Sequence, residues 1–330
     1  MKALSVLLVS VFASLVFSGC GEDDASPKYD VYVYGMNNQQ AAYWKNGDLH
    51  YLTDGTKPST TSSAVFSGSD FYVAGMEAIG QNWNPVYWKN GVKVPLSDGS
   101  TSEHTWGMTV SGPDVYVAGF EFRDGTMFAK YWKNGTANYL NDGTAMCRAF
   151  DILVIGNDVH VIGLETKPDS VIARYWKNGV LVKMPPTTPY GYFMDIGASG
   201  EDIYIVGYTV SENGQHQPKY WKNGIETALT GGARTAAIEF SGSDVYILDG
   251  GWGRYWKNGE PHSLPVEGLD HVAPVGIAVV GNEIFVAANN LRSSNNETLG
   301  AYLWRSDVAQ APFLGNNPGV ELKGLVIRVH

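Results

Sequence analysis

Two aspartates stand at the same place in successive copies of an internal repeat, and as a pair they could support acid–base chemistry. Asp151 and Asp195 are 44 residues apart, and a repeat brings equivalent positions of neighbouring units close together. One of two adjacent carboxyl groups holds its proton more tightly, so the pair could divide the acid and base roles that glycoside hydrolysis needs. With His104 or Tyr192 nearby, the base of a polysaccharide lyase is also conceivable. An aspartate so placed can equally bind exposed backbone amides, and the sequence leaves both interpretations open.

The other repeats carry small or aliphatic residues at this position, which indicates a crowded place near the axis of the assembly. Asp151 and Asp195 are therefore the two candidates for catalysis. The residues aligned with them are Ser63, Gly107, Ala237, Gly276 and Val326.

Three positions earlier in each repeat stands a mostly polar and partly basic set, just ahead of the strand that should lie innermost. Converging Arg, Lys and His side chains suit a carboxylate or sulfate, and a tyrosine adds a stacking face. We therefore predict a binding site at a channel mouth for an acidic glycan or another anion. The alternative is a solvated loop surface with unrelated polar residues. The aligned set is Thr60, His104, Arg148, Tyr192, Arg234, Ala273 and Lys323, and His271 lies two residues before Ala273.

These residues belong to a repeat that runs through the whole chain. The string Tyr-Trp-Lys-Asn-Gly occurs six times, and a degenerate seventh copy follows. The first four of its tryptophans are 44 residues apart. A second string, typified by Asp114-Val115-Tyr116-Val117, recurs once per unit. The seven tryptophans of the repeat are Trp44, Trp88, Trp132, Trp176, Trp221, Trp256 and Trp304.

Each unit contains four short runs with β character, separated by turn residues. In one unit these runs cover residues 105–110, 114–118, 127–133 and 136–140. Asn134-Gly135 is a hairpin signal, because both turn positions need positive φ. Four strands in a unit of this length predict a blade of a β-propeller.

The chain ends complete the same scheme. The first unit opens at Asp30 without an innermost strand, and residues 324–329 supply a strand with nothing after it. We therefore predict an all-β, seven-bladed β-propeller of four antiparallel strands per blade over residues 29–330. The C-terminal strand should join the N-terminal blade and so remove an open sheet edge.

The repeat resembles a known type. The repeat is similar to the extracellular propeller repeats of bacterial secreted proteins, including the HAF type. The likeness runs from Asp30 to Val329 and rests on the pattern Ala-x-Tyr-Trp-Lys-Asn-Gly, Leu-x-Asp-Gly and Ser-Gly-x-Asp-Val-Tyr-Val-Ala-Gly. The resemblance implies the architecture and no particular activity, because propellers host many functions.

The first 28 residues carry their own signals. A basic start and an apolar run over residues 3–17 predict a signal peptide at 1–19. The segment 17–20 resembles the lipobox of bacterial lipoproteins, which implies a diacylated Cys20 and a membrane as partner. The acidic run at 21–24 resembles the surface-export signal of Bacteroidota lipoproteins, although an acidic linker without export meaning would also fit. For the apolar run at 3–17 the alternative is an uncleaved anchor helix. We expect a lipidated acidic linker at 20–28 and a lipoprotein of the outer membrane, surface-exposed or facing the periplasm.

Composition narrows the remaining possibilities. The net charge is −10, which disfavours a nucleic-acid partner. Cys147 is the only cysteine besides Cys20, so we expect a small buried thiol and no internal disulfide. No spacing typical of a metal site or a phosphate loop occurs, so we expect neither metal nor cofactor, and a monomer.

Three tryptophans lie outside the repeat. Trp106 and Trp252 align with apolar positions of other units and should be buried, whereas Trp83 could be a sugar platform or a buried side chain. The expected function is a binding or scaffold propeller of the cell envelope that takes a carbohydrate. A protein-interaction module is the second possibility, and a polysaccharide hydrolase or lyase is the third.

Overall fold

The protein is described from a computed structural model, which covers residues 29–184, 190–266, 269, 271–292, 294, 297–306, 308–309 and 319–330. The predicted signal peptide, the lipidation of Cys20 and the acidic linker lie outside these residues. Strands, turns and bends make up the described ranges, with no helix among them. Accordingly, no described segment is a helix long and apolar enough to span a membrane.

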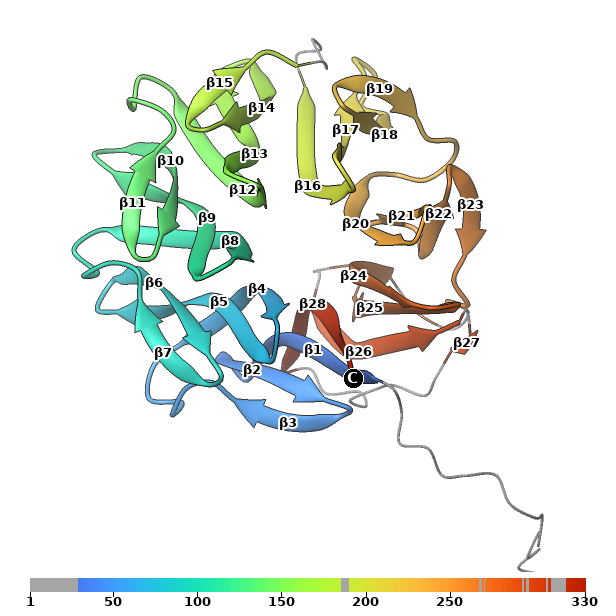
Figure 1. The fold of residues 1–330 in the computed structure, drawn as a ribbon, viewed down its shortest axis with the longest axis horizontal. Coiled ribbons are helices and arrows are strands. Elements are labelled where there is room, and N and C mark those ends of the chain that lie inside the picture. The colour runs from blue at the N-terminus through green and yellow to red at the C-terminus, as the bar shows by residue number, and fades with distance from the viewer. Residues whose placement is uncertain are drawn as a thin grey trace, which may run out of the picture.

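Seven antiparallel four-stranded sheets stand around a common axis, which confirms the predicted seven-bladed propeller (Figure 1). Blade 1 contains β28 (Val320–Val329), β1 (Tyr29–Asn37), β2 (Gln40–Lys45) and β3 (Asp48–Tyr51). Blade 2 contains β4 (Ser59–Ser67), β5 (Asp70–Ile79), β6 (Asn82–Lys89) and β7 (Val92–Pro95). Blade 3 contains β8 (Ser102–Ser111), β9 (Asp114–Arg123), β10 (Thr126–Lys133) and β11 (Thr136–Tyr139).

The other four blades repeat this order. Blade 4 contains β12 (Met146–Ile155), β13 (Asp158–Lys167), β14 (Ser170–Lys177) and β15 (Val180–Val182). Blade 5 contains β16 (Gly191–Ser199), β17 (Asp202–Val210), β18 (His216–Lys222) and β19 (Ile225–Ala228). Blade 6 contains β20 (Thr235–Ser241), β21 (Asp244–Asp249), β22 (Arg254–Lys257) and β23 (Glu260–Ser263). Blade 7 contains β24 (His271–Val280), β25 (Glu283–Leu291), β26 (Thr298–Arg305) and β27 (Val308–Ala309).

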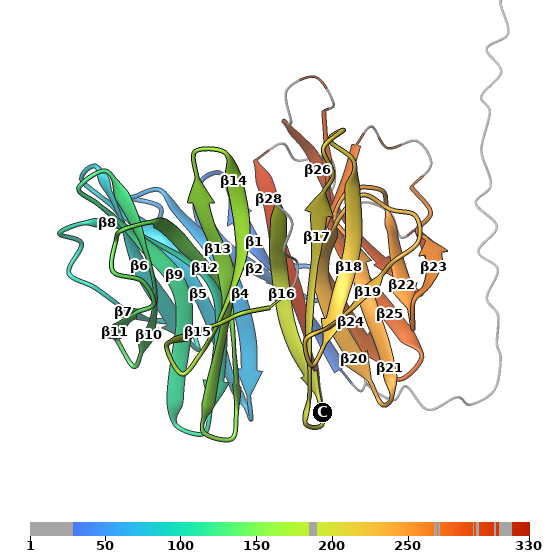
Figure 2. The same cartoon turned by 90° about the horizontal axis from the view of Figure 1, so that it is seen from above.

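The two ends of the described chain close the ring in blade 1. β28 pairs antiparallel with β1, with Tyr29 opposite Val329 and Asn37 opposite Val320. Seen from the side, the inner strands run roughly along the axis of the ring (Figure 2). The first strand of each blade is thus the innermost, and its second edge has no strand partner.

The Asn-Gly pairs form the predicted hairpin turns and carry a repeated polar cluster. Asn46 has φ 50° and Gly47 has φ 98°, both in the left-handed region. The Asn46 side chain donates to Asp30 and accepts from the Val31 amide. Lys45 completes the cluster through an ion pair with Asp30. The aspartates ahead of these strands are therefore turn and edge residues, as predicted.

The repeat tryptophans fill the interfaces between blades, which confirms their predicted structural role. Trp44 of blade 1 packs with Ala287 and Leu303 of blade 7, and Trp132 of blade 3 packs with Ala74 of blade 2. Each such ring buries on the order of 150–250 Å². The core is thus a series of contacts between neighbouring sheets arranged around the ring.

Two of the three other tryptophans are not buried, contrary to the prediction. Trp252 is 62% exposed in the turn between β21 and β22, where the Arg254 guanidinium lies 5.4 Å from its ring. The alignment failed there because β21 and β22 are shorter than their counterparts in blades 3 and 4, so Trp252 lies in the turn between them and not on a strand. Trp106 is also exposed, at 46%, on an inner strand. Trp83 is half-buried on β6.

Candidate functional site

The inner strands surround a cavity of about 970 Å³ at the axis of the ring. All seven of them contribute lining residues. Because each inner strand has a sheet partner on one side only, its free edge and alternate side chains face this space. The cavity is therefore the place where differences among the repeats meet.

A β-bulge at the same register in every inner strand shapes the cavity wall. One residue, or two on β8, is left unpaired there, and the strand bends. The bulged residues turn toward the cavity and differ in every blade. They are Ser62, Trp106, Phe150, Met194, Ala236, Val275 and Lys323.

The bulges correct the predicted alignment of the last strand. Lys323 is the bulged residue of β28, and Gly324 follows it. Gly324, rather than Val326, is therefore the counterpart of Asp151. The error arose because the alignment used the glycine of the turn after each inner strand, and no such turn follows β28.

The structure brings four of the six predicted binding residues to the cavity: His104, Arg148, Tyr192 and Lys323. The sequence had suggested that these residues lie ahead of the innermost strands. The first three instead lie within their strands. Arg234 and His271 are not among the cavity's lining residues. Arg234 is exposed, and its Nη2 lies 3.4 Å from the Gly250 carbonyl oxygen.

Stacking fixes two of these side chains. The His104 ring lies on Phe120, with centroids 4.7 Å apart and planes 7° apart. Burial lowers the pKa of His104, so the ring is neutral at pH 7. Tyr192 lies on Tyr208 in the same way, at 4.6 Å and 13°. Both rings thus present one face or an edge to the cavity.

The charged side chains of the set are placed differently. Lys323 Nζ forms an ion pair with Glu321. Arg148, within the described part of the chain, forms no ion pair, and its Nε is buried without a hydrogen-bond partner. An unpaired guanidinium on a cavity wall is available to an anionic ligand.

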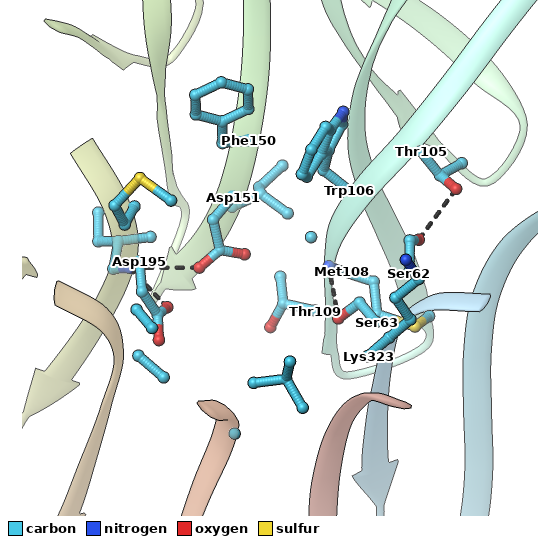
Figure 3. Close-up of a pocket in the computed structure, with 18 of the residues that line it drawn as sticks. Ser62, Ser63, Thr105, Trp106, Met108, Thr109, Phe150, Asp151, Asp195 and Lys323 are labelled. Carbon is cyan, nitrogen blue, oxygen red and sulfur yellow. Dashed lines mark hydrogen bonds between the residues drawn. The ribbon is translucent and has the colours of Figure 1, made fainter. Parts of the chain in front are cut away.

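Trp106 is a cavity residue that the sequence prediction missed. Its indole faces the same space as Phe150, with ring centroids 5.1 Å apart and planes 57° apart (Figure 3). The sequence carried little signal for this, because Ser62 is the only polar residue that its alignment matches to Trp106, and the second polar counterpart, Lys323, follows only from the bulge register.

Asp151 and Asp195 lie together, as predicted, and bind backbone amides of neighbouring inner strands (Figure 3). The Ile196 amide donates to Asp195 Oδ1 at 2.7 Å and to Asp151 Oδ2 at 3.2 Å. The Ile238 amide of blade 6 donates to Asp195 Oδ2 at 2.8 Å. Both oxygens of Asp195 are therefore occupied by amides, and the pair links blades 4, 5 and 6.

Burial and mutual repulsion keep a proton on this pair. Burial raises the pKa of Asp151, and the Asp195 carboxylate raises it further. The pKa of Asp195 is also raised by burial, partly offset by the hydrogen bonds it accepts from Asp151 and the amides. Two residues after Ala237, on β20, burial raises the pKa of Glu239 to about 7. Glu239 also lines the cavity, and the sequence prediction did not single it out.

Replacing Asp151 with Asn should stabilise the protein at alkaline pH. The raised pKa means that the folded protein keeps a proton that the unfolded chain releases near pH 4, so this group destabilises the fold as pH rises. Asn keeps an acceptor for Ile196 and a donor for Asp195 without a proton to lose. Thermal unfolding should show a melting temperature a few degrees above the unsubstituted protein at pH 8 and little difference at pH 3.5.

The control for this substitution is Asp202→Asn. Hydrogen bonds from Lys222 and Asn223 lower the pKa of Asp202, so its loss should destabilise at pH 8. A lower melting temperature for Asp151→Asn at pH 8 would mean that Asp151 is ionised in the folded protein.

Two further expectations concern metals and the thiol. No group of three or more His, Cys, Asp or Glu residues that could hold a metal ion occurs within the described ranges. Cys147 is buried in the core of blades 3 and 4, as predicted, and burial raises the pKa of its thiol to about 11.

Comparisons with known proteins found only distant structural likenesses. No protein-family model and no curated protein matches the sequence, so the likeness to HAF-type repeats stays a prediction. TolB from Acinetobacter baumannii is similar at 9% identity and a TM-score of 0.47, over 79% of this chain and 61% of that one. A puromycin-hydrolyzing peptidase of Mycobacterium tuberculosis gives the same identity and TM-score, over 79% of this chain and 52% of that one. A chain of the nidogen/laminin complex is similar at 10% identity and a TM-score of 0.42, over 90% of this chain and 98% of that one. Likeness at this level says nothing about ligand or activity.

Proposed function

We propose that the protein is a binding propeller that takes a carbohydrate in its central cavity and does not transform it. The observation that carries the proposal is the exposed indole of Trp106 inside a cavity of about 970 Å³. A flat aromatic face beside hydrogen-bonding groups suits the mixed apolar and polar surface of a sugar ring. Ser62, Thr60 and Tyr192 supply such groups elsewhere on the lining of the same cavity.

The unpaired Arg148 favours an acidic glycan over a neutral one. Its guanidinium can bind a carboxylate or sulfate with two parallel hydrogen bonds. The non-catalytic part of the proposal rests on Asp195, both of whose oxygens already accept backbone amides. A nucleophile or base needs an oxygen free to reach the substrate.

Trp106→Ala and Arg148→Ala should each weaken glycan binding by about tenfold or more, as expected for the loss of one stacking or one charge-assisted contact. The test is a glycan-array and calorimetric screen on residues 21–330 with acidic and neutral oligosaccharides. Only the acidic ones should respond to Arg148→Ala.

Trp252→Ala is the matched control, because Trp252 is an exposed tryptophan outside the cavity. Equal affinity of Trp106→Ala and the unsubstituted protein would refute the cavity as the binding site. Release of reducing sugar during the screen would show catalysis and overturn the non-catalytic part.

A further inference from the structure

Seven equivalent backbone amides follow the bulges of the inner strands and lie on their free edges. Each amide belongs to the second residue after the bulged residue of its strand, so all seven occupy the same position in their blades. An amide at such an edge needs an acceptor other than the sheet. The seven residues are Ala64, Met108, Ile152, Ile196, Ile238, Ile277 and Leu325.

In five of the seven blades a side chain of the protein accepts this hydrogen bond. Ser63 Oγ accepts from the Met108 amide at 3.2 Å. The carboxyl groups of Asp151 and Asp195 accept from Ile152, Ile196 and Ile238. In blade 2 the Tyr34 hydroxyl accepts from Ala64, and it lies where a side chain at Gly324 would begin.

Blades 7 and 1 break this pattern. The residues that should reach the amides of Ile277 and Leu325 are Ala237 and Gly276, which have no polar side-chain atom. A Cβ added to Gly276 would stand 2.9 Å from the Leu325 nitrogen, which is too close for a side chain, so the Leu325 amide lies immediately beside the backbone of Gly276. No side-chain oxygen in the described part of the chain bonds either amide. All four residues line the cavity.

Asp195 shows which chemical group fits two such amides. Its carboxylate spans the amide of its own strand and that of the next blade, at 2.7 and 2.8 Å. Gly276 holds the same position in β24, and its two amides are those of Ile277 and Leu325. A carboxylate from outside could therefore occupy the place that Asp195 fills in blade 5.

We propose that the Gly276 notch, formed by Ala237, Gly276 and the amides of Ile277 and Leu325, binds a carboxylate of the ligand. This inference rests on the proposed function and names its substrate class as glycans that contain a uronic acid. Lys323 is the bulged residue of β28, two positions before Leu325, and lines the same cavity. Two amide donors reduce the desolvation cost of the incoming charge, as they do in part for Asp195, whereas the Lys323 ammonium is paired with Glu321.

The test compares the disaccharide glucuronate-β1,4-glucose with cellobiose, in which a hydroxymethyl group replaces the carboxylate. Ala237→Ser places a hydroxyl where Ser63 stands in blade 2, so it should occupy the Ile277 amide. Calorimetry should show at least about a tenfold loss of affinity for the acidic disaccharide, as for one lost hydrogen bond to a charged group, and no change for cellobiose. In unsubstituted protein labelled with ¹⁵N-Ile and ¹⁵N-Leu, only the acidic disaccharide should move the Ile277 and Leu325 amide protons downfield.

Ala198→Ser is the matched control, because it makes the same change on β16 outside the cavity lining. If the acidic disaccharide binds Ala237→Ser as tightly as the unsubstituted protein, or leaves both amides unmoved, the notch is wrong and the proposed function stands. If neither disaccharide binds the folded, unsubstituted protein, the proposed function fails for uronic-acid glycans and the notch fails with it. Thermal unfolding verifies that each variant is folded.

Discussion

A chain that ends at Gly319 will fail to form a stable ring, because it lacks β28. This strand is the only neighbour of β1 besides β2 within the described residues. It buries Val320, Leu322 and Leu325 against Val33 and Phe285. Three fully buried aliphatic side chains contribute together about 5–9 kcal/mol. That is comparable to the whole stability of a typical domain, about 5–15 kcal/mol, and the truncation also leaves β1 with an open edge.

The measurement is circular dichroism and size-exclusion chromatography of residues 21–319. We expect loss of a cooperative thermal transition and a shift toward aggregates. A synthetic peptide of residues 319–330, added in trans, should restore the transition. Leu322→Ala in the full chain is the graded counterpart, with an expected loss of about 2–5 kcal/mol. A monomeric truncated chain with an unchanged melting temperature would show that the ring does not depend on this closure.

The architecture could be predicted because it follows from features that recur in every unit. The Trp of each Tyr-Trp-Lys-Asn-Gly string fills the same inter-blade contact, and each Asn-Gly pair takes the same turn. A signal repeated seven times outweighs the local ambiguity of any single strand. Even the closure by the C-terminal strand followed, since one inner strand was missing at the start and one was left over at the end.

The candidate site was predicted less completely, because it depends on the bulges. An inserted residue reverses which side chains of a strand face the cavity, and composition does not mark where that happens. Trp106 was therefore assigned to the core, and Lys323 was aligned two positions from its true counterpart. Arg234 and His271 do not line the cavity, since Arg234 comes just before β20 and His271 lies four residues before the bulge of β24. The aspartate pair was located correctly because it lies one residue past the bulge in two consecutive blades with the same spacing.

The same comparison explains where function can reside in this fold. The amides after the bulges need acceptors, and most blades supply one from the preceding or the same blade. Where the sequence replaces the acceptor by Ala237 or Gly276, the ring gains no stability from that position. A site of this kind is visible only against the five other copies, which show what a complete position looks like.

A buried ion cluster in blade 3 is the other feature whose loss should have a large effect. Lys130 on β10 is 2% exposed and bonds Glu103 on β8 and Glu121 on β9. The Tyr139 hydroxyl on β11 also donates to Glu121. Burial alone would raise the pKa of Glu121, but hydrogen bonds from Tyr139 and Lys130 more than offset it and lower the pKa. The Lys130 ammonium thus pairs with two buried carboxylates, and the half-exposed Arg123 guanidinium also contacts Glu121, at 3.3 Å.

Lys130→Met should lower the free energy of unfolding by about 3–5 kcal/mol, because it leaves the buried Glu103 without a cation and Glu121 with only the half-exposed Arg123 guanidinium. The loss should be larger at pH 8 than at pH 4.5, since the unpaired carboxyl groups can take up protons as pH falls. Chemical denaturation at both pH values measures this.

Lys93→Met is the matched control. Lys93 pairs with Glu77, which is the counterpart of Glu121 in blade 2, but the Lys93 side chain is 51% exposed. Its loss should therefore cost less than about 1 kcal/mol. Replacing Glu103 and Glu121 by Leu in addition to Lys130→Met should recover most of the stability, because a fully apolar cluster leaves no buried charge. Equal losses for Lys93→Met and Lys130→Met, or no recovery in the triple variant, would show that the cluster contributes through packing and not through charge compensation.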